Sequence, residues 1–99
     1  MSTPEGAVKR RVKKLLEEFG VHYFMPVQNG MGAPHLDFIC CYNGRYFAIE
    51  TKAGNKQPTV RQAGTIRNIQ LAKGLAFVVN EETGMDTLRV WLEEVAGCS

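Results

Sequence analysis

The chain has 99 residues, of which 44% are hydrophobic and 22% are charged. This length suits one small domain with a single core, spanning residues 1–99, and excludes a second domain or a large appended module. No apolar run approaches the length of a membrane span, and the polar, then basic start of the chain lacks the apolar segment of a signal peptide. We therefore expect a soluble, cytoplasmic protein that makes no contact with a membrane.

The formal charge of +2 conceals an asymmetry along the chain. Residues 1–80 carry 11 basic and 5 acidic side chains, whereas residues 81–99 carry 1 and 5. A basic body suits a polyanionic partner, but mild basicity is also common in proteins that bind no nucleic acid. Charge alone therefore identifies no partner.

The three cysteines do not form a disulfide framework, because their number is odd and Cys40 and Cys41 are adjacent on a predicted strand. We expect reduced, buried thiols. A structural zinc ion would need four convergent ligands, and the cysteines and the two histidines lack the paired spacing of such sites. A redox or metal-storage role for the adjacent cysteines is a distant alternative.

The first predicted element is a helix from about Pro4 to Phe19. Ser2 or Thr3 can cap it, and Gly20 can end it. Its apolar residues recur at helical spacing and form one stripe: Val8, Val12, Leu15, Leu16 and Phe19. A strand is predicted next over Val21 to Val27, followed by a glycine-rich loop over residues 28–34.

A β-hairpin is predicted over residues 35–52, because Asn43-Gly44 joins two β-prone runs. A two-residue turn fixes the pairing register. If Tyr42 pairs with Arg45, then Asp37 falls opposite Glu50.

The last third of the chain predicts two helices and a strand. A loop over residues 53–58 leads to a helix from Thr59 to about Lys73, whose apolar pattern is ragged. Residues 75–79 contain no polar side chain, which is typical of a strand covered on both faces. Asp86 is expected to cap a final helix with Leu88, Trp91, Leu92 and Val95 on one face. The order αβββαβα predicts an α/β fold with a mixed sheet flanked by helices.

The opposed carboxylates of Asp37 and Glu50 predict a metal site. Like charges that face each other across a ladder are destabilising unless a cation lies between them, and Lys52 projects from the same face as Glu50. Carboxylates are ligands that Mg²⁺ prefers, and the carbonyl of Thr51 is a plausible further ligand. Lys52 beside the ion would position a water molecule or neutralise charge on a phosphate.

The alternative is an ordinary ion pair between Glu50 and Lys52 on a solvated strand. Against it, Asp37 and Glu50 are the only acidic residues between Glu18 and Glu81, and the register makes them neighbours. Chance placement is therefore a poor explanation.

Glu5 and Gln62 each have two interpretations. Glu5 lies in line with the apolar stripe of the first helix, which would direct it toward the metal site, but residues 2–5 also fit a capping box. Gln62 would hold a water or a phosphate, or complete a capping box with Thr59.

Several residues are candidate contacts to a nucleic-acid backbone. The glycine-rich loop with Gly32 would allow close approach of a phosphate, and His35 would fall opposite Lys52 in the predicted register. Lys56 and Arg61 would add salt-sensitive, sequence-independent affinity. Solvated surface is the alternative for each of them.

One ordered set of motifs resembles the VRR-NUC branch of the PD-(D/E)XK nucleases. The set comprises Gly32-x-Pro34-x-x-Asp37, a spacer with Asn43-Gly44-Arg45, Ile49-Glu50-Thr51-Lys52-Ala53-Gly54, Thr59-x-x-Gln62, and Gly74 before an apolar strand. The resemblance covers about Glu5 to Asn80. The family's Pro-Asp pair is here separated by two extra residues, which implies an altered turn before Asp37.

The resemblance implies a restriction-endonuclease-like αβββαβ core with a mixed four-stranded sheet and an extra C-terminal helix. It also implies Mg²⁺- or Mn²⁺-dependent hydrolysis of DNA phosphodiesters. By this resemblance, Asp37, Glu50 and the Thr51 carbonyl bind metal, Lys52 supports the attacking water, and Glu5 and Gln62 assist.

Stand-alone members of the family, frequent in bacteriophages, are similar to Holliday-junction resolvases and act as homodimers. The expected function is therefore that of a structure-selective endonuclease on branched DNA. The alternatives are the same chemistry on nicked, flap or duplex DNA, and a non-catalytic nucleic-acid-binding subunit with this fold.

Overall fold

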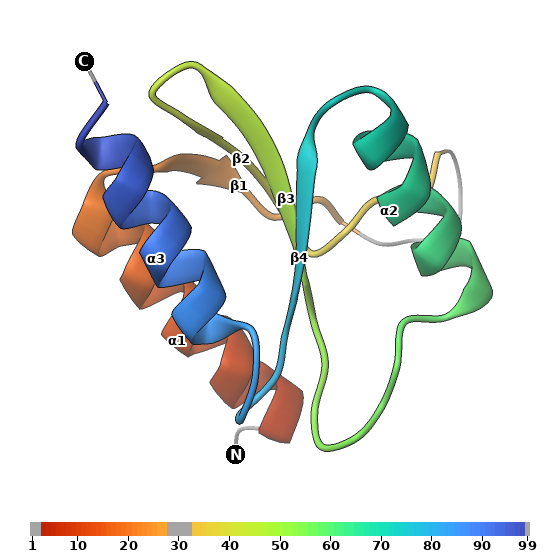
Figure 1. The fold of residues 1–99 in the computed structure, drawn as a ribbon. Coiled ribbons are helices and arrows are strands. Elements are labelled where there is room, and N and C mark those ends of the chain that lie inside the picture. The colour runs from red at the N-terminus through yellow and green to blue at the C-terminus, as the bar shows by residue number, and fades with distance from the viewer. Residues whose placement is uncertain (1–2, 28–32, 99) are drawn as a thin grey trace.

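The computed structural model describes residues 3–27 and 33–98, which form three helices and one four-stranded sheet. In chain order the elements are α1 (Pro4–Phe19), β1 (His22–Phe24), β2 (Phe38–Tyr42), β3 (Arg45–Thr51), α2 (Val60–Leu71), β4 (Leu75–Val79) and α3 (Met85–Ala96). The strands lie in the order β1-β2-β3-β4, with β3 and β4 parallel and the other pairs antiparallel. Helices α1 and α3 cover one face of the sheet and α2 lies on the other (Figure 1). The predicted mixed sheet, αβββαβ core and extra C-terminal helix are confirmed.

Helix α1 begins and ends where the sequence predicts. The Thr3 hydroxyl accepts a hydrogen bond from the Gly6 N–H at 2.9 Å, which satisfies one of the free amides of the first turn. Gly20 follows the helix with φ 71°, a left-handed conformation that favours glycine. The other proposed cap, Ser2, lies outside the described residues.

The hairpin has the predicted register. Tyr42 pairs with Arg45, and the ladder continues to the pair of Phe38 and Ile49. Asn43 and Gly44 both have positive φ, 51° and 79°, as the favoured two-residue hairpin turn requires.

The strand β1 is shorter than predicted. It ends at Phe24 rather than Val27, so the prediction of a strand over residues 21–27 was wrong at both ends. Pro26 has no N–H to donate to a ladder, which explains why pairing does not continue far beyond Phe24.

The strand β4 is an edge strand and is only partly covered. Val79 is buried, but Leu75 is 40% exposed and Val78 is 37% exposed. The prediction of coverage on both faces was therefore wrong. The reason is that β4 has one neighbouring strand, and that α2 buries none of its own residues.

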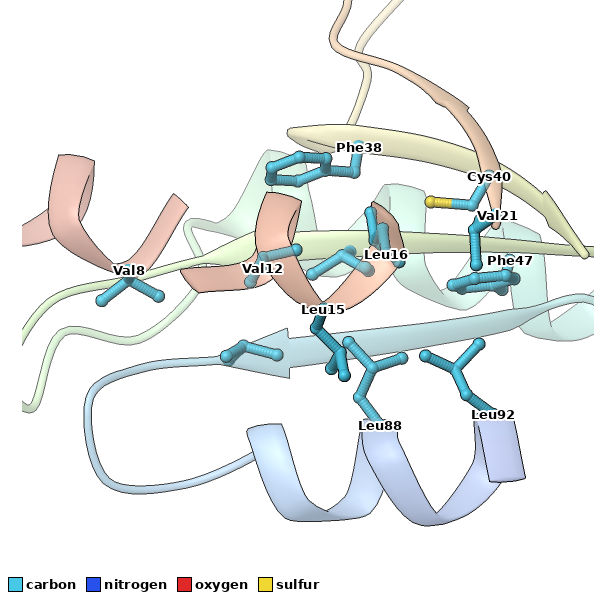
Figure 2. Packing of buried hydrophobic residues seen from close by; sticks show 12 residues of the cluster. Val8, Val12, Leu15, Leu16, Val21, Phe38, Cys40, Phe47, Leu88 and Leu92 are labelled. Atoms are coloured by element: carbon cyan, nitrogen blue, oxygen red, sulfur yellow. The ribbon is translucent and has the colours of Figure 1, made fainter. Parts of the chain in front are cut away.

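The hydrophobic core lies between the sheet and the pair α1 and α3. Figure 2 shows the side chains of α1 and α3 directed at one another and at the sheet. The labelled members of this cluster are Val8, Val12, Leu15, Leu16, Val21, Phe38, Cys40, Phe47, Leu88 and Leu92. The apolar stripe predicted for α1 therefore packs as expected, and α3 completes the layer.

Helix α3 begins at Met85, with Gly84 rather than Asp86 at the N-cap position. Asp86 lies in the first turn, so the predicted cap was wrong by two residues. Gly84 has φ 94° and packs directly on the backbone of Val78 and Val79. A salt bridge at 2.9 Å between Arg89 and Glu18 links α3 to α1.

Cys40 is buried, whereas Cys41 and Cys98 are exposed, and all three are free thiols. The prediction of buried thiols holds for Cys40 alone, because consecutive residues on a strand point to opposite faces. Within residues 3–27 and 33–98, no helix has the length and apolar character needed to span a bilayer.

Candidate active site

Asp37 lies immediately before β2 and is anchored by Thr51 of β3. Its Oδ2 accepts two hydrogen bonds from Thr51, one from the backbone N–H at 2.9 Å and one from the hydroxyl at 2.6 Å. The other carboxylate oxygen, Oδ1, lies 3.8 Å from the Lys9 ammonium. One oxygen of Asp37 is thus held by hydrogen bonds from β3, while the other faces Lys9 in a longer ion pair.

Glu50 is a buried carboxylate, and one of its oxygens has no hydrogen-bond partner among the described residues. The residue is 2% exposed. Its Oε2 lies 3.5 Å from the Lys52 ammonium, whereas no described residue hydrogen-bonds to Oε1. Burial, together with the negative charge of Asp37, raises the pKa of Glu50 to about 7, and Lys52 only partly offsets this rise.

The donor set fits a small divalent cation. A buried carboxylate oxygen without a partner is costly, and a second carboxylate beside it adds repulsion. Among the described residues there is no group of three or more His, Cys, Asp or Glu side chains placed to hold an ion. Mg²⁺ and Mn²⁺ do not need one, since Mg²⁺ is commonly held by one or two carboxylates with water and substrate oxygens. The Thr51 carbonyl as a further ligand stays a prediction.

Lys52 lies where β3 leaves the sheet. Its backbone N–H donates to the Val79 carbonyl at 2.9 Å, and its side chain is only 12% exposed. The ion pair with Glu50 therefore forms, as the alternative interpretation expected, but the strand that carries it is not solvated. An ion pair buried to this degree is a poor source of stability and a frequent feature of functional sites.

Glu5 reaches this site through Lys9, a residue that the sequence reasoning did not select. Thr3 is the cap of α1 and the third helical residue is Gly6, so Glu5 is not part of a capping box with Thr3. Its carboxylate lies 3.6 Å from the Lys9 ammonium, which also faces Asp37. The sequence does indicate Lys9 in one way: it follows Glu5 by one helical turn, and Glu5 lies on the core-facing stripe of the helix.

Gln62 forms the capping box of α2. Its side-chain oxygen accepts from the Thr59 N–H at 2.9 Å, and its own N–H donates to the Thr59 hydroxyl at 3.2 Å. The structural interpretation of this residue is therefore confirmed. An additional role of its amide at the site remains a prediction.

The proposed nucleic-acid contacts are dispersed. Gly32 lies outside the described residues. His35 precedes the first ladder pair, so it does not pair with Lys52 as predicted; instead it lines a cavity of about 980 Å³ that also borders Tyr46 and α2. Lys56 and Arg61 are both exposed, at the loop after β3 and in the first turn of α2.

These features define a class of protein: an α/β domain with a mixed four-stranded sheet flanked by helices, in which an acidic pair and a lysine lie together at the end of the β2–β3 hairpin. No family model matches the chain, and no curated protein matches it. A solved structure titled "VRR_NUC domain" matches it with a TM-score of 0.70 and 18% identity, over 96% of each chain. The fold is therefore that of a VRR_NUC domain, as the sequence resemblance predicted.

Proposed function

We propose that this protein is a metal-dependent DNA endonuclease. The observation that carries the proposal is the buried Glu50 carboxylate beside Asp37 and Lys52, with one oxygen to which no residue of the described ranges donates a hydrogen bond. The VRR_NUC-like fold supports it, since the structural neighbour's title denotes a nuclease domain. Mg²⁺ or Mn²⁺ is the expected cofactor, because both carboxylates are hard oxygen donors.

Each residue has a distinct task in this proposal. Asp37 and Glu50 would hold the ion, which neutralises their charge, polarises the phosphate and lowers the pKa of water. Lys52 would position the attacking water or stabilise charge on the phosphate as one P–O ester bond breaks and the alcohol leaves. Thr51 keeps Asp37 in place through two hydrogen bonds.

Branched DNA is the proposed substrate, and a homodimer is the proposed assembly. A two-fold dimer presents two sites to paired strands, whereas one domain of this size offers a single site. Exposed apolar residues on α2 and β4 support association, because the surface includes Leu71 at 66%, Leu75 at 40% and Val78 at 37% exposure. Flap, nicked and duplex DNA are the alternative substrates.

A cleavage assay tests the proposal. Labelled four-way junction, flap, duplex and single-stranded DNA are incubated with Mg²⁺ or Mn²⁺ and with the wild type, Asp37→Ala, Glu50→Gln or Lys52→Ala. Glu93→Gln and Lys13→Ala are matched controls, since both residues are exposed and distant along the chain from the acidic pair. We expect cleavage by the wild type and the controls, and a loss on the order of a hundredfold or more in the three site variants.

Two outcomes would contradict the proposal. Equal cleavage by the site variants and the controls would remove Asp37, Glu50 and Lys52 from the reaction. Salt-sensitive DNA binding without cleavage of any substrate would instead identify a non-catalytic nucleic-acid-binding subunit.

The role of Gln62 is separable from its capping role. Gln62→Glu keeps the carbonyl-type oxygen that the capping box uses but removes the amide donors. We expect unchanged thermal stability and cleavage that falls by about tenfold, equivalent to 1.36 kcal/mol of barrier. Unchanged cleavage would restrict Gln62 to capping α2.

A further inference from the structure

Lys9 and Thr51 approach different oxygens of the Asp37 carboxylate. Thr51 donates two hydrogen bonds to Asp37 Oδ2, at 2.9 and 2.6 Å. The remaining oxygen, Oδ1, faces the Lys9 ammonium at 3.8 Å. Lys9 therefore lies beside Oδ1, the Asp37 oxygen to which Thr51 donates no hydrogen bond.

Lys9 joins two carboxylates from different parts of the chain. Its ammonium lies 3.6 Å from Glu5 Oε2, one turn earlier on α1, as well as near Asp37. Lys52 has the corresponding position at Glu50, where its ammonium lies 3.5 Å from Oε2, while Oε1 accepts no hydrogen bond from residues 3–27 or 33–98. Each acidic residue of the pair thus has its own lysine.

The two lysines differ in how firmly they are held. The Lys52 side chain is 12% exposed and follows a strand buried against its neighbours, whereas the Lys9 side chain is 33% exposed on a helix. A partly exposed ion pair at this distance contributes little free energy, and a flexible lysine leaves it easily. Of the two lysines, Lys9 is therefore the one that a metal ion can displace more easily.

We propose that Lys9 is a positioning residue that holds Asp37 and Glu5 together in the metal-free protein and is displaced from Asp37 when a divalent ion binds. This inference rests on the proposed metal site at Asp37 and Glu50. Because metal binding would have to break the ion pair between Lys9 and Asp37, Lys9 weakens metal binding. Its release also frees an ammonium beside the site.

Metal affinity in the absence of DNA tests this inference independently of cleavage. Mn²⁺ is titrated calorimetrically into the wild type, Lys9→Met, Lys9→Arg and Lys13→Met. Lys13→Met removes the same charge from an exposed position one turn further along α1, so it reports the effect of net charge alone. Thermal unfolding by circular dichroism confirms that each variant is folded.

We expect Lys9→Met to bind Mn²⁺ roughly three- to tenfold more tightly than Lys13→Met, and Lys9→Arg to match the wild type. Equal or weaker Mn²⁺ binding by Lys9→Met, with measurable binding by the wild type, would overturn the inference and leave the metal site intact. Failure of all four proteins to bind Mn²⁺ would overturn the proposed metal site and this inference together. Binding by Lys9→Met alone would support both.

Discussion

At the scale of single residues, Glu50 combines deep burial with a nearby like charge. Its carboxylate is 2% exposed, lies beside Asp37 and has one oxygen without a hydrogen-bond partner in the described part of the chain, so its charged form is unfavourable. The ion pair with Lys52 only partly offsets this cost. The charged acidic pair therefore destabilises the metal-free protein, and a cation bound at the pair would reduce this destabilisation.

The raised pKa of Glu50 predicts a loss of stability as the pH rises from about 4.5 to about 7 in metal-free buffer. The unfolded chain loses this proton near pH 4.5, whereas the folded protein keeps it up to about pH 7. The folded state thus binds more protons between these values, so its stability falls as pH rises through them, by up to about 3 kcal/mol. Glu50→Gln should remove this decline.

Thermal unfolding of the wild type and Glu50→Gln at pH 5 and pH 8 measures the effect. Glu93→Gln, an exposed glutamate on α3, is the control and should retain the wild-type dependence. Parallel pH profiles for the wild type and Glu50→Gln would show that burial of Glu50 does not shift its titration.

Divalent ions should stabilise the folded protein through the same two carboxylates. An ion bound only to the folded state contributes about 2.7 kcal/mol at a concentration one hundred times its Kd. We expect Mn²⁺ to raise the melting temperature of the wild type at pH 8 and to leave that of Asp37→Asn unchanged. A similar rise in both proteins would indicate that the ion binds elsewhere.

At the scale of elements, the stability of α2 depends more on the capping of its first turn than on packing against the rest of the protein. None of its residues is buried, and Gly64 lies in its interior. Its first turn is held by the reciprocal hydrogen bonds of Thr59 and Gln62. Capping therefore compensates for the small apolar area that this helix buries, and it fixes the Gln62 side chain against Thr59.

Thr59→Ala should destabilise the protein by about 1 kcal/mol, because the N–H of Gln62 loses its acceptor. Thr65→Ala is the matched control in the same helix. The Thr65 hydroxyl donates to the Arg61 carbonyl, which already accepts a backbone hydrogen bond of the helix. Loss of the hydroxyl should therefore be neutral or slightly stabilising. Chemical denaturation of both variants gives the comparison, and equal effects would argue against the capping box.

At the scale of the whole molecule, the turn between β4 and α3 connects the two layers of the core. Gly84 lies directly on the backbone of β4, and α3 then returns across α1, where Arg89 pairs with Glu18. The layer formed by α1 and α3 covers the sheet on the face opposite α2 (Figure 1). Close approach at Gly84 therefore sets how α3 completes the core.

Gly84→Ala should cost about 3 kcal/mol or more. A methyl group there would overlap the carbonyl oxygen of Val78, and φ 94° is strained for any other residue. Gly64→Ala is the control of opposite sign, because a methyl group at Gly64 meets open space within α2 and should stabilise by about 0.5–1 kcal/mol. Thermal unfolding of the two variants tests both signs, and similar melting temperatures would contradict this account.

The sequence by itself determined the order of elements, the hairpin register and the electrostatic proximity of Asp37 and Glu50. These depend on local rules: helical spacing in α1, a cap at Thr3, and positive φ at Asn43 and Gly44. Local rules failed where the outcome depended on neighbours, as in the short β1 and the half-covered edge strand β4. The capping and site interpretations of Gln62 also could not be separated by spacing.

Only the tertiary structure decided how Asp37 and Glu50 are surrounded. The Thr51 carbonyl as a metal ligand stays a prediction, whereas the anchoring of Asp37 by the Thr51 N–H and hydroxyl appears only in the structure. Lys9 is far from Asp37 in the chain and comes beside it only because α1 packs across the sheet. Burial and electrostatic interactions depend on distances between elements, and residue spacing along one chain does not specify those distances.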